Sequence, residues 1–228
     1  AKMAATLDVI SSGRLELGIG AGIQKEEHIA YGFSFPEARS RIERLEEAVA
    51  ILKKLWTEEK ASFKGNHYEV NGAVCEPKPL QKPHPPITIG GSGEKLTLKV
   101  TARYADRCDF GYLPSIELYK RKIAVLEAHC RAVGRDPNEI ELSCWPGGQV
   151  LIASSQKELR RIVLERKPKN VSLKDFENLN LAGTPDVCLK KLRSYLDLGF
   201  THFMLFFSEL PCLDGLTIFA ESVMKKLQ

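Results

Sequence analysis

Apolar residues along the chain follow two alternating patterns, one typical of buried strands and one typical of amphipathic helices. Short apolar segments predict strands at residues 14–21, 87–89, 107–111, 141–152 and 202–207. Apolar residues spaced three or four apart predict helices at about residues 36–56, 94–104, 115–133, 156–166, 184–198 and 213–227. The better strands are continuous apolar runs, which indicates parallel strands covered on both faces. Strand and helix alternate five times, so we expect an α/β fold.

Five parallel strands fit two architectures. They form either an open, doubly wound sheet or five eighths of a (β/α)₈ barrel, and the local pattern does not separate the two. Residues 1–12 have the spacing of a helix already under way, without an N-cap, and Gly13 stops it. We therefore expect the chain to begin inside a larger architecture.

Turn residues mark the segments between these elements. Residues 61–72 alternate around Lys64-Gly65-Asn66 and predict a β-hairpin. Residues 76–86 carry five prolines and predict an extended linker that is neither helix nor inner strand. Pro36 and Pro185 are expected to open their helices, because proline suits the first helical position. The polar stretch between the helices at 156–166 and 184–198 predicts no clear element.

The composition is that of an ordinary folded protein, with 43% hydrophobic and 27% charged residues among 228. It excludes a disordered or coiled-coil chain. The 33 basic and 29 acidic residues are interspersed and give a net charge of +4, whereas nucleic-acid binders gather their basic residues in a patch. No apolar run approaches the ~18 residues that a membrane span requires. We expect a soluble protein with neither nucleic-acid nor membrane partners.

Six cysteines stand singly in apolar segments, where buried thiols behave as small hydrophobes. They are Cys75, Cys108, Cys130, Cys144, Cys188 and Cys212. None forms a CxxC pair or has a histidine at zinc-finger spacing, so the sequence predicts no metal site. A chain of this size does not need disulfides, and we expect a reducing, cytoplasmic compartment.

Two glycine-rich segments follow predicted strands, where βα folds place their active sites. In Gly90-Gly91-Ser92-Gly93, the absence of Cβ atoms lets backbone N–H groups approach an anion, and the next helix adds partial positive charge at its N-terminus. This predicts a phosphate site, with Lys95, Lys99 and Arg107 as nearby cations. The alternative is a tight strand-to-helix turn without a ligand.

The other glycine segment is Gly18-Ile19-Gly20-Ala21-Gly22. It is not a dinucleotide-binding motif, because no helix opens immediately after it. Its small residues suit a flat ligand lying against the strand end, or glycine packing at a crowded barrel mouth. Glu26 and Glu27 follow, and they either bind a hydroxyl or act as a base, or form the solvated first turn of a loop helix.

Histidines and nucleophiles offer no further site. His28, His67, His84, His129 and His202 share no i,i+4 spacing, so each is expected to be a surface or hydrogen-bonded core residue. The chain has no GxSxG nucleophile motif and no cysteine in a recognisable nucleophile setting.

Several segments together resemble the bacterial-luciferase-like superfamily, and most closely its coenzyme F420-dependent oxidoreductases. The segments are AKMAATLDVISSGRLELGIGAG, FSFPEARSRIERLEEAVAILKKLWTEEKASFKGNHYEV, EPKPLQKPHPPITIGGSGEKLTLKVTARYAD, HCRAVGRDP and AGTPD. They cover most of the chain in the family's order. The resemblance implies a single, partial (β/α)₈ TIM-barrel domain over residues 1–228, with the hairpin and proline-rich segment 61–86 as an insertion. Residues 14–21 would then be the fourth barrel strand and residues 202–207 the eighth.

The same resemblance implies a binding site for F420, with FMN as the alternative cofactor. Ala21 and Gly22 would lie beside the ring system, with Ile23 and Glu26 in the following loop. The segment Gly90, Gly91, Ser92 and Gly93 would hold the cofactor's phosphate. Asp109 stands where close relatives carry asparagine.

The implied activity is hydride transfer between F420 and a small organic substrate. The alternatives are an FMN-dependent monooxygenase of the same superfamily and a truncated, non-catalytic flavin- or phosphate-binding relative. Family members build much of the redox-ring pocket from the second and third strands, which have no counterpart here, so no catalytic acid or base is assigned. Five barrel strands leave two open edges, and we expect a homo-oligomer, such as a dimer, to cover them.

Overall fold

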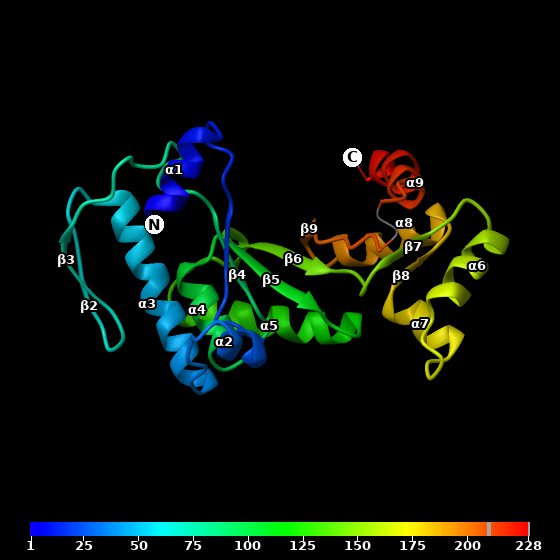
Figure 1. The fold of residues 1–228 in the computed structure, drawn as a ribbon, viewed down its shortest axis with the longest axis horizontal. Coiled ribbons are helices and arrows are strands. Elements are labelled where there is room, and N and C mark those ends of the chain that lie inside the picture. Colours follow the sequence, from blue (N-terminus) through cyan, green and yellow to red (C-terminus); the bar gives the residue numbers. More distant parts are fainter. Residues whose placement is uncertain (209–210, 228) are drawn as a thin grey trace. The chain divides into compact units, whose positions relative to one another are not determined.

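A computed structural model describes residues 1–208 and 211–227 of the chain (Figure 1). The chain divides into two units, and each is described by itself. Unit 1 is Ala1–Asp109 with Ile123–Ile140, and unit 2 is Phe110–Lys122 with Glu141–Gln228. Within the described ranges, no helix combines the length and the apolar character needed to cross a bilayer.

Three strands of unit 1 form a parallel sheet, as the sequence predicts. They are β1 (Leu17–Ile19), β4 (Ile87–Gly90) and the first residues of β5 (Arg107–Tyr112). Ile19 pairs with Ile89, and Ile89 pairs with Cys108, so β4 lies between its two neighbours. The carboxyl ends of β1 and β4 therefore meet at one edge. β1 is shorter than the predicted 14–21, because the chain leaves the ladder at Gly20.

The core of unit 1 forms between this sheet and the helices. The helices are α1 (Lys2–Ile10), α3 (Ala38–Thr57), α4 (Thr97–Tyr104) and the unit 1 part of α5 (Ile116–Ala132). Val49 and Trp56 of α3 pack with Ile87 and Ile89 of β4 in one buried cluster. The Trp56 Nε1–H donates to the carbonyl of Ala1 at 3.0 Å, which ties α1 to α3.

The predicted β-hairpin is present (Figure 1), and one carboxylate of α3 ties it to that helix. Its strands are β2 (Ala61–Lys64) and β3 (Glu69–Ala73), which are antiparallel. Glu47 accepts the backbone N–H groups of Asn66, His67 and Tyr68 at 2.7, 3.0 and 2.9 Å. A Cβ on Gly65 would lie 2.4 Å from the Glu47 carboxylate, so a larger residue there would have to displace this carboxylate from the turn. The next segment, 74–86, contains neither helix nor strand, as its prolines predict.

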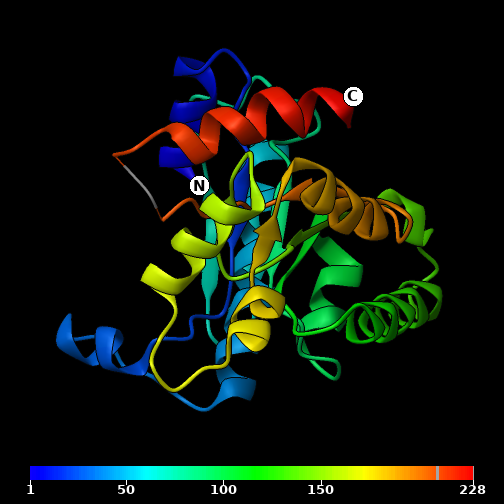
Figure 2. The same cartoon turned by 90° about the vertical axis from the view of Figure 1, so that its right-hand side faces the viewer.

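Unit 2 contains two pairs of parallel strands. β6 (Glu141–Trp145) pairs with β9 (Phe200–Phe203), and β7 (Val150–Ile152) pairs with β8 (Leu181–Gly183). The helices are α6 (Gln156–Arg166), α7 (Leu173–Leu179), α8 (Pro185–Leu196) and α9 (Asp214–Ser222), which a 3₁₀ turn at Met224–Lys226 follows. Figure 2 shows α9 and this turn, in red, as one helical segment. The other 3₁₀ turn, Pro137–Glu139, belongs to unit 1.

Two strand predictions for unit 2 are wrong in detail. Pro146-Gly147-Gly148 predict a break in the segment 141–152, and the structure confirms the break, but the two parts are separate strands, β6 and β7, which belong to different sheets. A Cβ on Gly147 would lie 2.3 Å from the Leu181 nitrogen, so the chain turns here against β8. The last strand is Phe200–Phe203 rather than 202–207, because the chain leaves β6 after Met204, whose N–H still donates to Cys144. The Phe206 carbonyl instead accepts the N–H of Val150.

Helix boundaries also shift. α4 begins at Thr97, three residues later than predicted, after a turn at residues 94–96. Pro36 precedes α3, whose N-cap is Glu37, whereas Pro185 opens α8 as predicted. A short helix, α2 (Lys25–Ala30), occupies part of the loop after β1, which matches the loop-helix interpretation of Glu26 and Glu27.

Unit 2 has a buried tyrosine whose hydroxyl is hydrogen-bonded to the backbone. The Tyr119 side chain is 0% exposed; its hydroxyl accepts the Leu113 N–H at 2.9 Å and donates to the Gly111 carbonyl at 2.8 Å. In a Tyr119→Phe variant the buried Leu113 N–H loses its acceptor, so we expect a loss of about 1–3 kcal/mol in the free energy of unfolding. Urea denaturation measures this loss. Tyr31→Phe, at an exposed site, is the control; an equal loss in both variants would contradict the expectation.

Candidate functional site

The two glycine segments of unit 1 lie at one cavity. β1 and β4 are parallel neighbours, so their carboxyl ends bring the segments together. The cavity has a volume of about 590 Å³, within the range of ~300–1,000 Å³ typical of small-molecule sites. It is lined by Gly20, Ala21, Gly22, Ile23, Ala38, Arg41, Ile42, Gly90, Gly91 and Thr97. Five of the eight residues singled out from the sequence are therefore in this lining.

The other three residues differ in position. Ser92 and Gly93 directly follow Gly91 at the cavity's edge, and Gly93 approaches Thr97, whose Oγ1 would be 2.8 Å from a Cβ built on the glycine. Glu26 lies in the first turn of α2 and is exposed, and it is not part of the lining.

Backbone geometry requires glycine at two of these positions. Gly22 has a φ of +79° and Gly91 a φ of +128°, which residues with a side chain rarely adopt. A Cβ on Gly22 would lie 2.9 Å from the His28 ring, and one on Gly91 would lie 3.1 Å from Thr97 Cγ2. A Cβ on Gly90, by contrast, meets nothing within 4 Å. Gly20, Gly22, Gly90 and Gly91 thus line the cavity without side chains.

The backbone N–H groups of the second glycine segment are not equivalent. The Gly91 N–H donates to the Asp109 carbonyl at 2.9 Å and is used by the sheet. Within residues 1–208 and 211–227, the N–H groups of Ser92 and Gly93 donate to no protein acceptor. Two adjacent donors are therefore available to an anion. The prediction that a helix N-terminus directly follows this segment is wrong, because α4 begins only at Thr97.

A histidine is hydrogen-bonded to the turn at residues 94–96, which follows the second glycine segment. His129, on α5, lies with its Nε2 2.7 Å from the carbonyl of Glu94, and the Leu98 N–H donates to the carbonyl of Gly93. His129 is therefore a hydrogen-bonded structural residue, as expected. Arg107 does not reach the cavity edge, since it pairs with Glu16 at the amino end of β5.

Arg41 is a site residue that the sequence reasoning missed. Its Nε–H donates to the Pro36 carbonyl at 3.0 Å, and its Nη1 donates to the carbonyls of Ala21, at 3.2 Å, and Gly22. The guanidinium carbon lies 3.9 Å from the centre of the Phe35 ring. Arg41 thus fixes the loop after β1. Its position among the charged residues of an amphipathic helix gave no signal of this role.

Among the described residues that line the cavity, Arg41 is the one with an ionisable side chain, and none is an Asp, Glu, His, Cys, Tyr or Lys. Within the described residues, no group of three or more His, Cys, Asp and Glu side chains could hold a metal ion. This lining can bind and orient a ligand.

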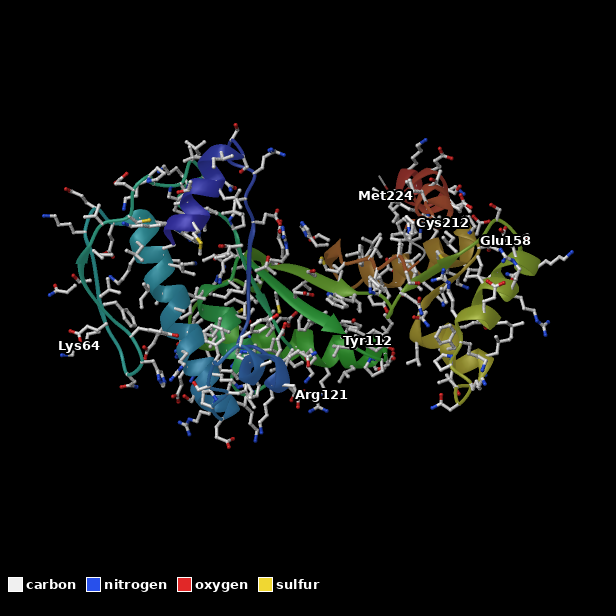
Figure 3. All side chains as sticks on the ribbon, in the orientation of Figure 1. Lys64, Tyr112, Arg121, Glu158, Cys212 and Met224 are labelled. Carbon is white, nitrogen blue, oxygen red and sulfur yellow. The ribbon has the colours of Figure 1, made fainter. Side chains whose placement is uncertain are left out.

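All six cysteines are free thiols, and five are buried, as expected. Burial raises the pKa of the Cys108 thiol strongly, and it raises the pKa of Cys188 to about 11. These thiols stay protonated at neutral pH and are poor nucleophiles. The prediction of burial is wrong for Cys212, which is exposed on the segment before α9 (Figure 3).

Comparisons with curated proteins find F420- and FMN-dependent enzymes. The F420-dependent glucose-6-phosphate dehydrogenase of Microbacterium testaceum is 29% identical over 227 residues, which cover 89% of this chain and 65% of that protein. The FMNH₂-dependent dimethylsulfone monooxygenase of Pseudomonas putida is 41% identical over 92 residues, covering 40% of this chain and 25% of that protein. This chain thus spans slightly less than two thirds of the length of the first relative.

Solved structures share the fold. An F420-dependent secondary alcohol dehydrogenase, in complex with an F420-acetone adduct, superposes with a TM-score of 0.80 at 21% identity, covering 100% of this chain and 74% of that one. The EDTA monooxygenase of Chelativorans sp. BNC1 gives a TM-score of 0.82 at 20% identity and covers 100% and 69%. The sequence model described as luciferase-like monooxygenase matches residues 1–167, so the chain belongs to the luciferase-like monooxygenase family.

Proposed function

We propose that this chain binds coenzyme F420 and is an oxidoreductase that moves a hydride between F420 and a small organic substrate. One observation carries the proposal: the glycines of two strand ends line a single cavity of cofactor size that has no acid or base of its own. Such a site needs its chemistry from a bound group. The F420-dependent relatives support F420 as that group.

The proposed cofactor site uses the residues at the two strand ends. Ala21 and Gly22 would lie beside the ring system, with Ile23 and Glu26 in the following loop. Gly90, Gly91, Ser92 and Gly93 would hold the phosphate, through the N–H groups of Ser92 and Gly93. The residues fit the group, because the Cβ position of Gly90 faces open space that a ligand can fill.

When bound, F420 would supply the hydride. The chain's own residues bind and orient it: Arg41 fixes the loop that carries Ala21 and Gly22, and Ile23 and Ile42 contribute apolar lining. Apolar lining keeps water from the reacting face.

The proposal includes the architecture and the assembly. The chain would form the last five βα units of a (β/α)₈ barrel, as one domain over residues 1–228 with the insertion at 61–86. β1 is the terminal strand of its sheet within the described residues, and a second copy of the chain would cover its free edge. We also propose that the chain is located in a reducing, cytoplasmic compartment.

A second candidate is FMN-dependent monooxygenation. The relative from Pseudomonas putida favours it, since its 41% identity over 92 residues is higher than that of the F420-dependent relative over a longer alignment. Both cofactors carry a phosphate group and a flat ring, so the same cavity suits either one.

Titration of the purified chain with F420 and with FMN, followed by cofactor fluorescence, separates the candidates. We expect F420 to bind more tightly. The bound cofactor is then compared with its phosphate-free parent, the deazariboflavin for F420 or riboflavin for FMN. Loss of the charged hydrogen bonds to Ser92 and Gly93 is expected to weaken binding at least about 10-fold. Equal affinities for the cofactor and its phosphate-free parent would exclude the phosphate site. If neither F420 nor FMN binds, both proposed functions are excluded.

A further inference from the structure

A second cavity of unit 1 has a cationic lining. It has a volume of about 390 Å³ and shares Gly20, Ala21 and Arg41 with the proposed cofactor cavity, so the two adjoin along the loop after β1. None of the residues 90–93 lines it. Its polar lining residues are His28, Ser34, Arg41, Arg44 and Tyr68.

The charges of α3 are separated onto two faces at this point. Arg41, Arg44 and Ala48, which follow helical spacing, line the second cavity. The carboxylates Glu43, Glu46 and Glu47 line a different hollow of the same unit. No acidic residue is among the lining of the second cavity, so its positive charge is not balanced from within.

Each of these carboxylates already has partners. Arg39 pairs with Glu43 at 3.0 Å, and Arg103 pairs with Glu46 at 2.5 Å. Glu47 accepts the three N–H groups of the hairpin turn. These partners are thus groups outside the lining of the second cavity, apart from the backbone N–H of Tyr68.

Arg44 is the cation without such a partner. Within residues 1–208 and 211–227, its exposed side chain has no hydrogen bond, ion pair or ring contact with the protein, whereas the Arg41 side chain already donates to three backbone carbonyls. The side-chain hydroxyls of Ser34 and Tyr68 also have no partner in this part of the chain. The cavity thus brings together a guanidinium fork and two hydroxyl donors without an internal acceptor.

We propose that this second cavity binds the oxyanion of a small molecule, a carboxylate or a phosphate group, with Arg44 as its principal cationic ligand. A guanidinium offers parallel N–H donors at the spacing of two oxygens of such a group. Ser34 and Tyr68 would donate further hydrogen bonds. The site goes beyond the proposed cofactor site, because Arg44 and both hydroxyls are absent from the lining of the latter.

Isothermal titration of the full chain at low ionic strength tests this site. The probes are inorganic phosphate and glutarate, each measured against chloride at equal ionic strength. We expect saturable binding of at least one probe, and the tighter probe identifies the group that the site prefers. Arg44→Gln is expected to weaken that binding at least about 10-fold, and Arg44→Lys, which keeps the charge but loses the fork, about 3-fold.

Arg39→Gln is the matched control. It removes the same charge from the same helix at a side chain that is 79% exposed and pairs with Glu43. Its affinity for the probe should stay within about 2-fold of the unmodified chain. Equal weakening by Arg44→Gln and Arg39→Gln, or no saturable binding of either probe, would overturn the proposal. F420 or FMN titration of Arg44→Gln, expected to match the unmodified chain, keeps this result separate from the proposed function.

Discussion

Replacing Gly90 with valine is expected to abolish cofactor binding while the chain stays folded. Gly90 ends β4 and lines the cavity, has no positive φ, and has open space where a Cβ would stand. A valine there needs no rearrangement of the protein and occupies the volume proposed for the cofactor. We expect binding at least about 100-fold weaker, which corresponds to about 2.8 kcal/mol, a cost within the range for forcing a side chain into occupied space.

Gly18→Val is the control for this variant. Gly18 also lies in a strand, β1, and a Cβ built on it meets nothing within 4 Å, but it lines neither cavity. Both variants are expected to unfold at the same or a slightly higher urea concentration than the unmodified chain. The reason is that valine stabilises a strand more than glycine does. If both variants weaken cofactor binding equally, or if Gly90→Val binds the cofactor as tightly as the unmodified chain, the cavity is not the cofactor site.

The parallel strands of this fold could be predicted because they are continuous apolar runs next to strong stop signals. β4 follows a proline-rich linker and ends at two glycines, and the structure places it within one residue of the prediction. α6 matches its predicted bounds. Its start is marked locally in the sequence, because the N-cap residue Ser155 accepts the N–H of Glu158.

The elements that were not predicted from the sequence depend on tertiary contacts or on short local signals. β8 has three residues, all buried, and is too short to show a period; it exists because it pairs with β7. α7 lies in the polar stretch that gave no prediction, although Ser172 caps it by accepting the Asp175 N–H. A capping serine before a short apolar pair was a usable signal there.

The site was predictable only in part, for the same reason. Glycines at strand ends are visible in the sequence, and five of the eight chosen residues line one cavity. The role of Arg41 depends on contacts with carbonyls twenty and nineteen residues away, which no local spacing reveals. Which backbone N–H groups are available was equally hidden, since the sheet uses that of Gly91 and not those of Ser92 and Gly93.

Replacing Asp8 with alanine is expected to cause a large loss of stability in unit 1. The Asp8 side chain is fully buried, and its carboxylate accepts the Gln81 N–H at 3.0 Å, the Gln81 Nε2–H at 2.7 Å and the Leu15 N–H at 3.4 Å. It thereby joins α1 to the start of β1 and to the proline-rich linker. Alanine leaves these donors without an acceptor, and we expect the free energy of unfolding to fall by about 2–4 kcal/mol.

The pH dependence of unfolding gives this prediction a second measurement. Burial alone would raise the pKa of Asp8, but the hydrogen bonds from Gln81 and Leu15 outweigh it and hold the pKa below its ordinary value. A lowered folded-state pKa means that Asp8 stabilises the fold above pH ~4 and that this contribution is lost as the pH falls through the folded pKa. The Asp8→Ala variant should therefore lose less stability than the unmodified chain on acidification.

Urea denaturation at pH 7 and at pH 3 measures both effects, with Asp186→Ala as the control. Asp186 is 86% exposed and pairs with Lys226 at 3.3 Å, so its removal should cost less than about 1 kcal/mol at pH 7. A buried acceptor differs from a surface ion pair because water cannot replace it: the donors of Gln81 and Leu15 must either go unsatisfied or pull the linker away from α1. If Asp8→Ala proves as stable as Asp186→Ala, the carboxylate is not what joins α1 to the linker, and the packing of Ala5 against the core is sufficient.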